Sequence, residues 1–90
     1  MVAGLELWFN SSDHLPPHFH ARRAGKFELR VFFLICTETH MEVSVKWMDR
    51  KRGVSRKHLD ALQEGAVRFR VELLEEWEEE VDPGGRHDET

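Results

Sequence analysis

The hydrophobic pattern of this chain changes its period once, near Ser55. Before that point, apolar and polar residues alternate over positions 27–35 and 41–47, as they do in half-buried strands. After it, apolar residues recur every three or four positions over 59–77, which is the stripe of an amphipathic helix. A chain of 90 residues with one such change predicts a single small α+β domain.

The alternating part predicts three strands. They span residues 5–9, 26–36 and 40–47, and the polar stretch at 37–39 is a suitable short link between the last two. We therefore expect an antiparallel hairpin with one further strand beside it. A sheet this small needs a helix across one face to bury its apolar side.

The helical part predicts one long C-terminal helix. Ser55 is a suitable N-cap, and Pro83 marks the end. Gly65 lies inside the apolar stripe, where it weakens a helix and permits a kink. The predicted fold is thus a small antiparallel three-stranded sheet packed against one long helix, with a domain at residues 1–82 and a flexible tail at 83–90.

The strands and the helix should share one hydrophobic core. Its expected members are Phe27, Val31, Val43, Val45, Leu62, Phe69 and Leu73. Cys36 is the only cysteine, and its apolar neighbours predict a buried, inert thiol. No apolar run approaches the roughly 20 residues that cross a bilayer, and the first residues do not resemble a signal peptide. We therefore expect a cytoplasmic protein without membrane contact.

Three histidines gather around two prolines early in the chain. They are His14, His18 and His20, and Pro16 and Pro17 lie between the first two. Proline fixes its own φ and restricts the preceding residue, so this segment is stiff. In an extended chain His18 and His20 point to the same side. Imidazole is the side chain best suited to bind metal or move protons near neutral pH.

Three interpretations of this segment remain open. His14, His18 and His20 bind a divalent metal, for which zinc with three protein ligands is the best match, and Asp13 is then a supporting group or an alternative ligand. Alternatively, the imidazoles form hydrogen bonds with backbone groups that the prolines leave unpaired. In the third interpretation, His18 and His20 act as catalytic acid and base on RNA without a metal.

Charge is distributed unevenly along the chain. The whole chain carries a net charge of -4, yet residues 1–71 are net positive and residues 72–90 are strongly negative. Basic side chains after His20 and in the loop before Ser55 are candidate contacts to nucleic acid or to a partner protein: Arg22, Arg23, Arg50, Lys51 and Arg52. The acidic end either binds a basic partner, covers the basic loop, or is simply solvated surface.

Two motifs together resemble the bacterial domain-of-unknown-function family 4160 over about residues 5–80. They are His14-Leu15-Pro16-Pro17-His18-Phe19-His20-Ala21 and, at the end of the helix, Glu72-Leu73-Leu74-Glu75-Glu76-Trp77. The resemblance carries no activity with it. It implies a small cytoplasmic protein with a small protein partner, in the manner of toxin–antitoxin pairs. Members commonly have a histidine where this chain has Phe69. If that histidine belongs to a site, this chain has lost it or uses His58 or His40 in its place.

Two functions remain in competition. The first is an interaction module of a two-component, toxin–antitoxin-like system, with the histidine and proline segment as its site. The second is a metal- or histidine-dependent phosphodiesterase or ribonuclease in which His18 and His20 are catalytic. The enzyme requires an open cleft around these histidines, whereas the module requires an exposed apolar or charged patch.

Overall fold

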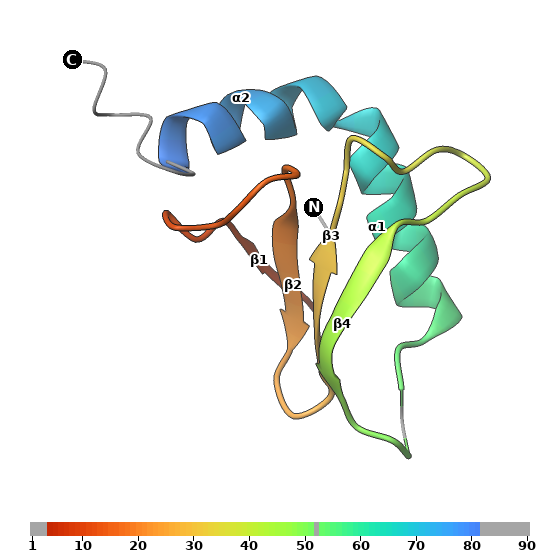
Figure 1. The fold of residues 1–90 in the computed structure, drawn as a ribbon. Coiled ribbons are helices and arrows are strands. Elements are labelled where there is room, and N and C mark those ends of the chain that lie inside the picture. The colour runs from red at the N-terminus through yellow and green to blue at the C-terminus, as the bar shows by residue number, and fades with distance from the viewer. Residues whose placement is uncertain (1–3, 52, 82–90) are drawn as a thin grey trace.

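The computed structural model describes residues 4–51 and 53–81, which form four strands followed by two helices (Figure 1). The elements are β1 (Glu6–Trp8), β2 (Phe19–Arg23), β3 (Phe27–Val31), β4 (Val43–Met48), α1 (Arg56–Arg68) and α2 (Arg70–Glu80). The α+β class is confirmed. The sheet, however, has four strands instead of three, and two helices replace the single long one. The expected domain boundary at residue 82 and the expected tail at 83–90 lie outside the described residues.

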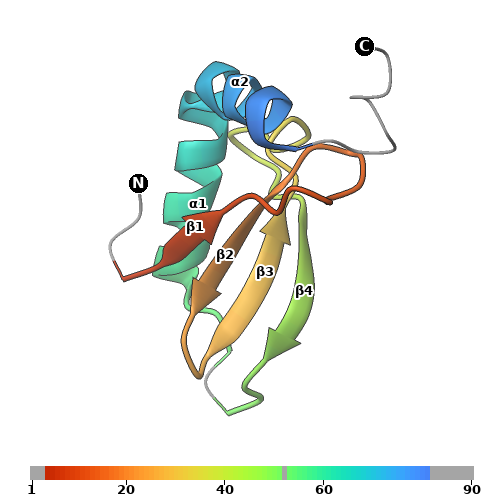
Figure 2. The same ribbon diagram turned by 90° about the vertical axis from the view of Figure 1, so that its left-hand side faces the viewer.

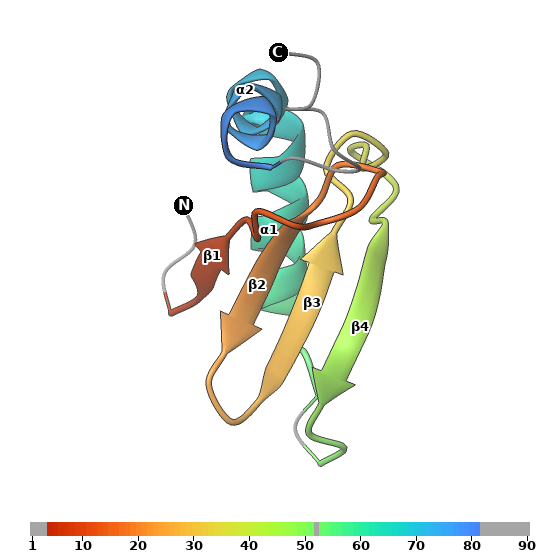
Figure 3. The ribbon, with the colours of Figure 1, turned by 60° about the vertical axis from the view of Figure 1, so that its left-hand side comes forward.

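The sheet is an antiparallel meander in the order β1-β2-β3-β4 (Figure 3). Leu7 lies opposite Ala21, Ala21 opposite Leu29, and Leu29 opposite Val45. Side chains at paired positions share a face, so these residues define the side that the helices cover. The register between β3 and β4 shifts at Lys46, which has no register partner in β3. Irregularities and lysines in an exposed edge strand commonly prevent it from pairing with another chain.

The sequence did not predict β2. This strand starts inside the histidine segment, and Phe19 and Ala21 are its only apolar residues. Two apolar positions are too few for a detectable alternation. Both are nevertheless buried, because β2 is an inner strand that pairs with β1 on one side and β3 on the other.

The strand predicted over residues 26–36 ends at Val31. The chain then turns, and the connection to β4 runs from residue 32 to residue 42. Phe33 and Cys36 in this connection are buried, whereas Leu34 is 38% exposed. The apolar run after Val31 therefore closes the end of the core as a loop, and the continuous strand inferred from it is wrong.

Helix α1 lies against one face of the sheet, and α2 runs across the end of the sheet where β2 begins and β3 ends (Figure 2). The predicted N-cap is confirmed, because the Ser55 hydroxyl accepts a hydrogen bond from the backbone N–H of His58 at 3.2 Å. The buried helix residues are Leu62, Gly65 and Ala66 in α1 and Leu73 and Trp77 in α2. None of the helices in the described part of the chain is long and apolar enough to cross a membrane.

The break between the helices falls at Phe69 and not at Gly65. Phe69 has φ -105° and ψ 22°, and α2 then runs in a different direction from α1 (Figure 1). Phe69 is 37% exposed at this corner, so its predicted place in the core is wrong. Val45 is 51% exposed, because β4 is an edge strand that the helices do not cover completely. The other predicted residues are buried or pack against the core: Phe27, Val31, Val43, Leu62 and Leu73.

Cys36 is buried, as predicted. Burial raises the pKa of its thiol, which keeps it protonated and unreactive at neutral pH. Its carbonyl oxygen accepts a hydrogen bond from the Arg70 guanidinium at 2.6 Å, which ties the connection between β3 and β4 to α2.

Candidate metal centre

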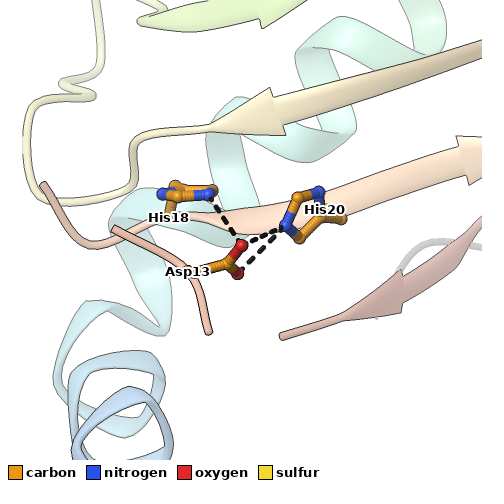
Figure 4. A group of neighbouring side chains, drawn as sticks. All are labelled: Asp13, His18 and His20. Carbon is orange, nitrogen blue, oxygen red and sulfur yellow. Dashed lines mark hydrogen bonds and ion pairs between the residues drawn. The ribbon is translucent and has the colours of Figure 1, made fainter. Parts of the chain in front are cut away.

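The two histidines that the sequence places on one side of the chain do lie together (Figure 4). His20 is in β2, opposite Trp8 of β1 and Arg30 of β3, and therefore on the sheet face turned away from the helices. His18 precedes β2 by one residue, and its ring centre lies 5.1 Å from that of His20. Both residues are buried, at 5% exposure for His18 and 2% for His20.

Asp13 reaches both histidines from the loop between β1 and β2. Its two carboxylate oxygens each lie 3.0 Å from Nε2 of His20, and Oδ1 lies 3.6 Å from Nε2 of His18. The backbone N–H of Asn10 donates to Oδ2 of Asp13, and the backbone N–H of Asp13 donates to the carbonyl of Asn10. This reciprocal pair fixes a turn that directs the carboxylate at the imidazoles.

A backbone carbonyl holds His18 in one orientation. Nδ1 of His18 lies 2.9 Å from the carbonyl oxygen of Pro16, to which it donates. Nε2 is then the ring nitrogen that faces Asp13. Metal-binding histidines have this arrangement, in which one ring nitrogen donates to a carbonyl and the other is free to coordinate.

His20 has acidic groups at both ring nitrogens. Asp13 lies at Nε2, while Glu28 of β3 lies 3.9 Å from Nδ1, which is buried and makes no hydrogen bond. The Trp8 ring stacks on His20 with centres 5.2 Å apart, and the Asn10 amide nitrogen lies 3.1 Å from Nε2. A neutral imidazole turns a lone pair toward one of these carboxylates. Only a second proton on the ring, or a cation bound at one nitrogen, gives both nitrogens a favourable interaction with the carboxylates that face them.

The charge of Asp13 is stabilised within this cluster. Burial by itself raises the pKa of a carboxyl group, but the hydrogen bonds from His20 and from the backbone N–H of Asn10, together with the electrostatic effect of the His20 and His18 rings, outweigh it. The pKa of Asp13 therefore lies below its ordinary value of 3.8. At neutral pH the cluster presents an anionic ligand beside two imidazole nitrogens.

Asp13, His18 and His20 fit a metal ion. Their ligand atoms all lie within 4.8 Å of one another. Bonds of about 2.0–2.1 Å in a tetrahedral zinc site place neighbouring ligand atoms about 3.3 Å apart. The separations of 3.0 Å and 3.6 Å between Asp13 and the two histidines lie on either side of that spacing.

The structure places His14 apart from this group. His14 is exposed in the loop, and Asp13 is the residue that meets His18 and His20. The two substitutes considered for the family's helix histidine also lie elsewhere: His40 pairs with Glu42 at 2.8 Å, and His58 packs 6.0 Å from the Phe27 ring.

The candidate basic contacts in the described residues lie on β2 and in the loop after β4. Arg22 makes an ion pair with Glu6 at 3.1 Å and lies over the Trp8 ring. Arg23 is exposed at the end of β2, while Arg50 and Lys51 are exposed in the loop after β4. Arg52 lies outside the described residues.

Sequence reasoning missed the role of Trp77 at this site. Its ring centre lies 5.6 Å from that of His18 and 6.0 Å from that of Phe9, while Phe32 contacts His18 at 5.2 Å. The helix motif that ends in Trp77 thus packs directly on the histidine motif. The presence of both motifs in one chain is the sequence feature that could have indicated this contact, but the sequence alone does not show that the two motifs touch.

Comparison with known proteins gives one match. The model of a domain of unknown function (DUF4160) matches residues 4–78, a range that includes the cluster and Trp77. No curated protein and no solved structure matches the chain.

Proposed function

The chain belongs to the DUF4160 family, and we propose that it is a small metal-binding domain. Asp13, His18 and His20 hold one divalent cation, with zinc as the best match to two imidazoles and a carboxylate. The observation that carries this proposal is the convergence of two buried Nε2 atoms on one partly buried carboxylate. Nδ1 of His20, buried without a hydrogen bond near Glu28, supports it.

The proposed ion has a structural role. Asp13 comes from a loop and His20 from an inner strand, so one ion bound to both fastens the loop to the sheet. His18 extends this connection to α2 through its contact with Trp77. Metal binding is then coupled to folding, because the unfolded chain does not hold the three ligands together.

The alternative phosphodiesterase or ribonuclease has less support. General acid–base catalysis requires that a substrate reach the reacting nitrogen within hydrogen-bond distance. His18 and His20 are 5% and 2% exposed, and their Nε2 atoms face Asp13. This burial favours an ion that organises the fold over one that activates water for a large substrate.

We further propose that the metal-bound domain acts through protein contacts, as an interaction module in a two-component, toxin–antitoxin-like system. Two features support this proposal. The edge strand β4 exposes Val45, Trp47 and Met48, and α2 is strongly acidic. A cytoplasmic location stays part of the proposal, because a lone buried thiol at Cys36 suits a reducing compartment.

Isothermal titration of the metal-free protein with zinc tests the binding site. We expect one site, with affinity reduced at least about tenfold in Asp13→Asn, His18→Ala and His20→Ala. His14→Ala and His40→Ala are the matched controls, and each should bind within about twofold of the original protein. Circular dichroism establishes that each variant is folded before it is titrated. Equal losses in the control variants, or no binding by the original protein, would refute the proposal.

A further inference from the structure

A groove of about 430 Å³ lies between β1 and α2, and none of the candidate metal ligands lines it. Leu7 and Phe9 form one wall, and Phe19 and Leu73 lie deeper, where they are almost fully buried. Glu76 and Glu80 of α2 line the opposite side. The groove is thus apolar at its base and acidic along one rim.

The same groove borders an open edge of the sheet. β1 (Glu6–Trp8) is the first strand of the meander, and within the described residues it pairs only with β2. The outer side of such a strand presents backbone N–H and C=O groups that a further strand can pair with. An extended peptide added there would place alternate side chains in the groove, which is a recurring mode of peptide recognition.

The acidic rim indicates the charge of the occupant. Glu76 and Glu80 are one helical turn apart, near the C-terminal end of α2, whose last turn has no basic residue. Like charges at this spacing and at this end of a helix are both unfavourable. Among the described residues, neither glutamate side chain makes a hydrogen bond or an ion pair. A cationic ligand in the groove would relieve this repulsion.

The chain itself is a poor source of that ligand. Residues 82–90 carry Asp82, Asp88 and Glu89 against the single Arg86, so this segment is net acidic. The basic loop after β4 lies at the opposite end of the molecule from α2 (Figure 1). Charge complementarity therefore favours a segment of a different protein.

We infer that the groove between β1 and α2 binds an extended segment of a partner protein that turns both apolar residues and lysine or arginine to one face. The backbone of the segment pairs with β1, and the side chains of that face enter the groove, where the apolar ones meet Leu7 and Phe9 and the basic ones meet Glu76 and Glu80. This inference uses none of the three candidate metal ligands, and a failure of zinc binding leaves it standing.

The test uses three pools of fluorescein-labelled synthetic octapeptides and the full chain. In the first pool every second position is Ser or Thr, and the positions between them hold Val, Ile, Leu or Phe in turn with Lys or Arg, so that both kinds share one face; the second has Glu or Asp in place of the basic residues. The third keeps the basic residues but has proline at two central positions. Fluorescence anisotropy at low and at physiological salt reports binding, and backbone amide shifts report where the peptides bind.

Only the first pool should bind, and it should shift the amides of Glu6–Trp8 and of residues 73–80. The double variant Glu76→Lys with Glu80→Lys should weaken this binding at least about tenfold. Its matched control, Glu75→Lys with Glu79→Lys, makes the same change of charge at exposed positions that do not line the groove. The control should bind within about twofold of the original protein at physiological salt, where unspecific attraction is screened.

Several results would overturn the inference. One is equal weakening in the two double variants, which would mean unspecific attraction to an acidic helix. Another is equal binding of the pool with proline, which cannot complete a strand ladder. A third is a dimer in sedimentation that Glu76→Lys with Glu80→Lys dissociates, because the groove would then hold a second copy of this chain.

Discussion

His20 is a buried histidine whose ring has an acidic group at each nitrogen. Its ring is enclosed by Trp8, and an acidic side chain faces each nitrogen: Asp13 at 3.0 Å and Glu28 at 3.9 Å. Glu28 is itself buried and is paired with Lys46 at 3.3 Å. A buried polar group without a partner costs about 1–3 kcal/mol. A cation at Nε2 allows Nδ1 to keep its proton and face Glu28, which removes that cost.

Glu28 is therefore expected to strengthen metal binding without touching the metal. Glu28→Gln should weaken zinc binding by up to about tenfold, because outer groups tune the ligand histidine. Glu42→Gln is the control, since Glu42 pairs with the exposed His40. Calorimetric titration of both variants measures the difference. Equal affinities in the two variants would show that Glu28 does not act on His20.

The loss of stability on truncating a helix residue should depend on how deeply that residue is buried in the structure, and not on its place in the apolar pattern of the sequence. Leu73 is 7% exposed, whereas Phe69 is 37% exposed at the corner between the helices. Leu73→Ala should lower the free energy of unfolding by about 2–5 kcal/mol, and Phe69→Ala by about 1 kcal/mol or less. Urea denaturation measures both values. A larger loss for Phe69→Ala would place this residue back in the core.

At the scale of elements, α2 packs against the candidate metal centre through Trp77. Trp77 packs on His18, so it holds the imidazole in place without contacting the proposed ion. Trp77→Leu should weaken zinc binding several-fold in protein that is still folded. Leu62→Ala in α1 is the control, because Leu62 is equally buried but lies outside the ring contacts of His18. Zinc titration well below the melting temperature tests this, and similar affinities in both variants would contradict it.

The elements also show where prediction from sequence succeeds. Alternation over positions 41–47 indicated β4 (Val43–Met48), and the stripe over 59–77 indicated the helical region, because both signals are local and repeated. β2 was missed because it is short and contains few apolar residues. The break at Phe69 was missed because it contains neither glycine nor proline, and the packing of α2 on the distant histidine segment determines its direction.

For the candidate site, too, the sequence predicted the part that depends on local backbone geometry and missed the part that depends on the fold of a loop. A period of two residues correctly placed His18 and His20 on one side, since this depends only on an extended backbone. The third group depends on a turn closed by hydrogen bonds between Asn10 and Asp13, which the sequence pattern does not reveal. The turn brings Asp13 to the histidines and leaves His14 exposed.

At the scale of the whole molecule, the proposed ion lies where the first loop, the inner strand β2 and α2 meet. The cluster joins the first loop to the inner strand β2, and His18 continues the contact to Trp77 in α2. A domain of 90 residues has a modest core. A ligand that binds only the folded state adds a stability that grows with its concentration.

Zinc should therefore raise the melting temperature. At a free concentration 100 times the dissociation constant, binding adds about 2.7 kcal/mol, which corresponds to roughly 10 °C or more in a domain of this size. A chelator should reverse the shift, and Asp13→Asn should abolish it. Scanning calorimetry with and without zinc measures the effect. An equal shift in Asp13→Asn would show that zinc stabilises the protein from another site.

The most direct test of the metal centre is the position of the ion itself. Crystals grown with zinc, measured on both sides of the zinc absorption edge, yield an anomalous difference map that locates only zinc. The proposed function predicts one strong peak about 2 Å from Nε2 of His18, Nε2 of His20 and a carboxylate oxygen of Asp13. A map with peaks only at exposed side chains such as His14 or His40, and none within the cluster, would contradict it.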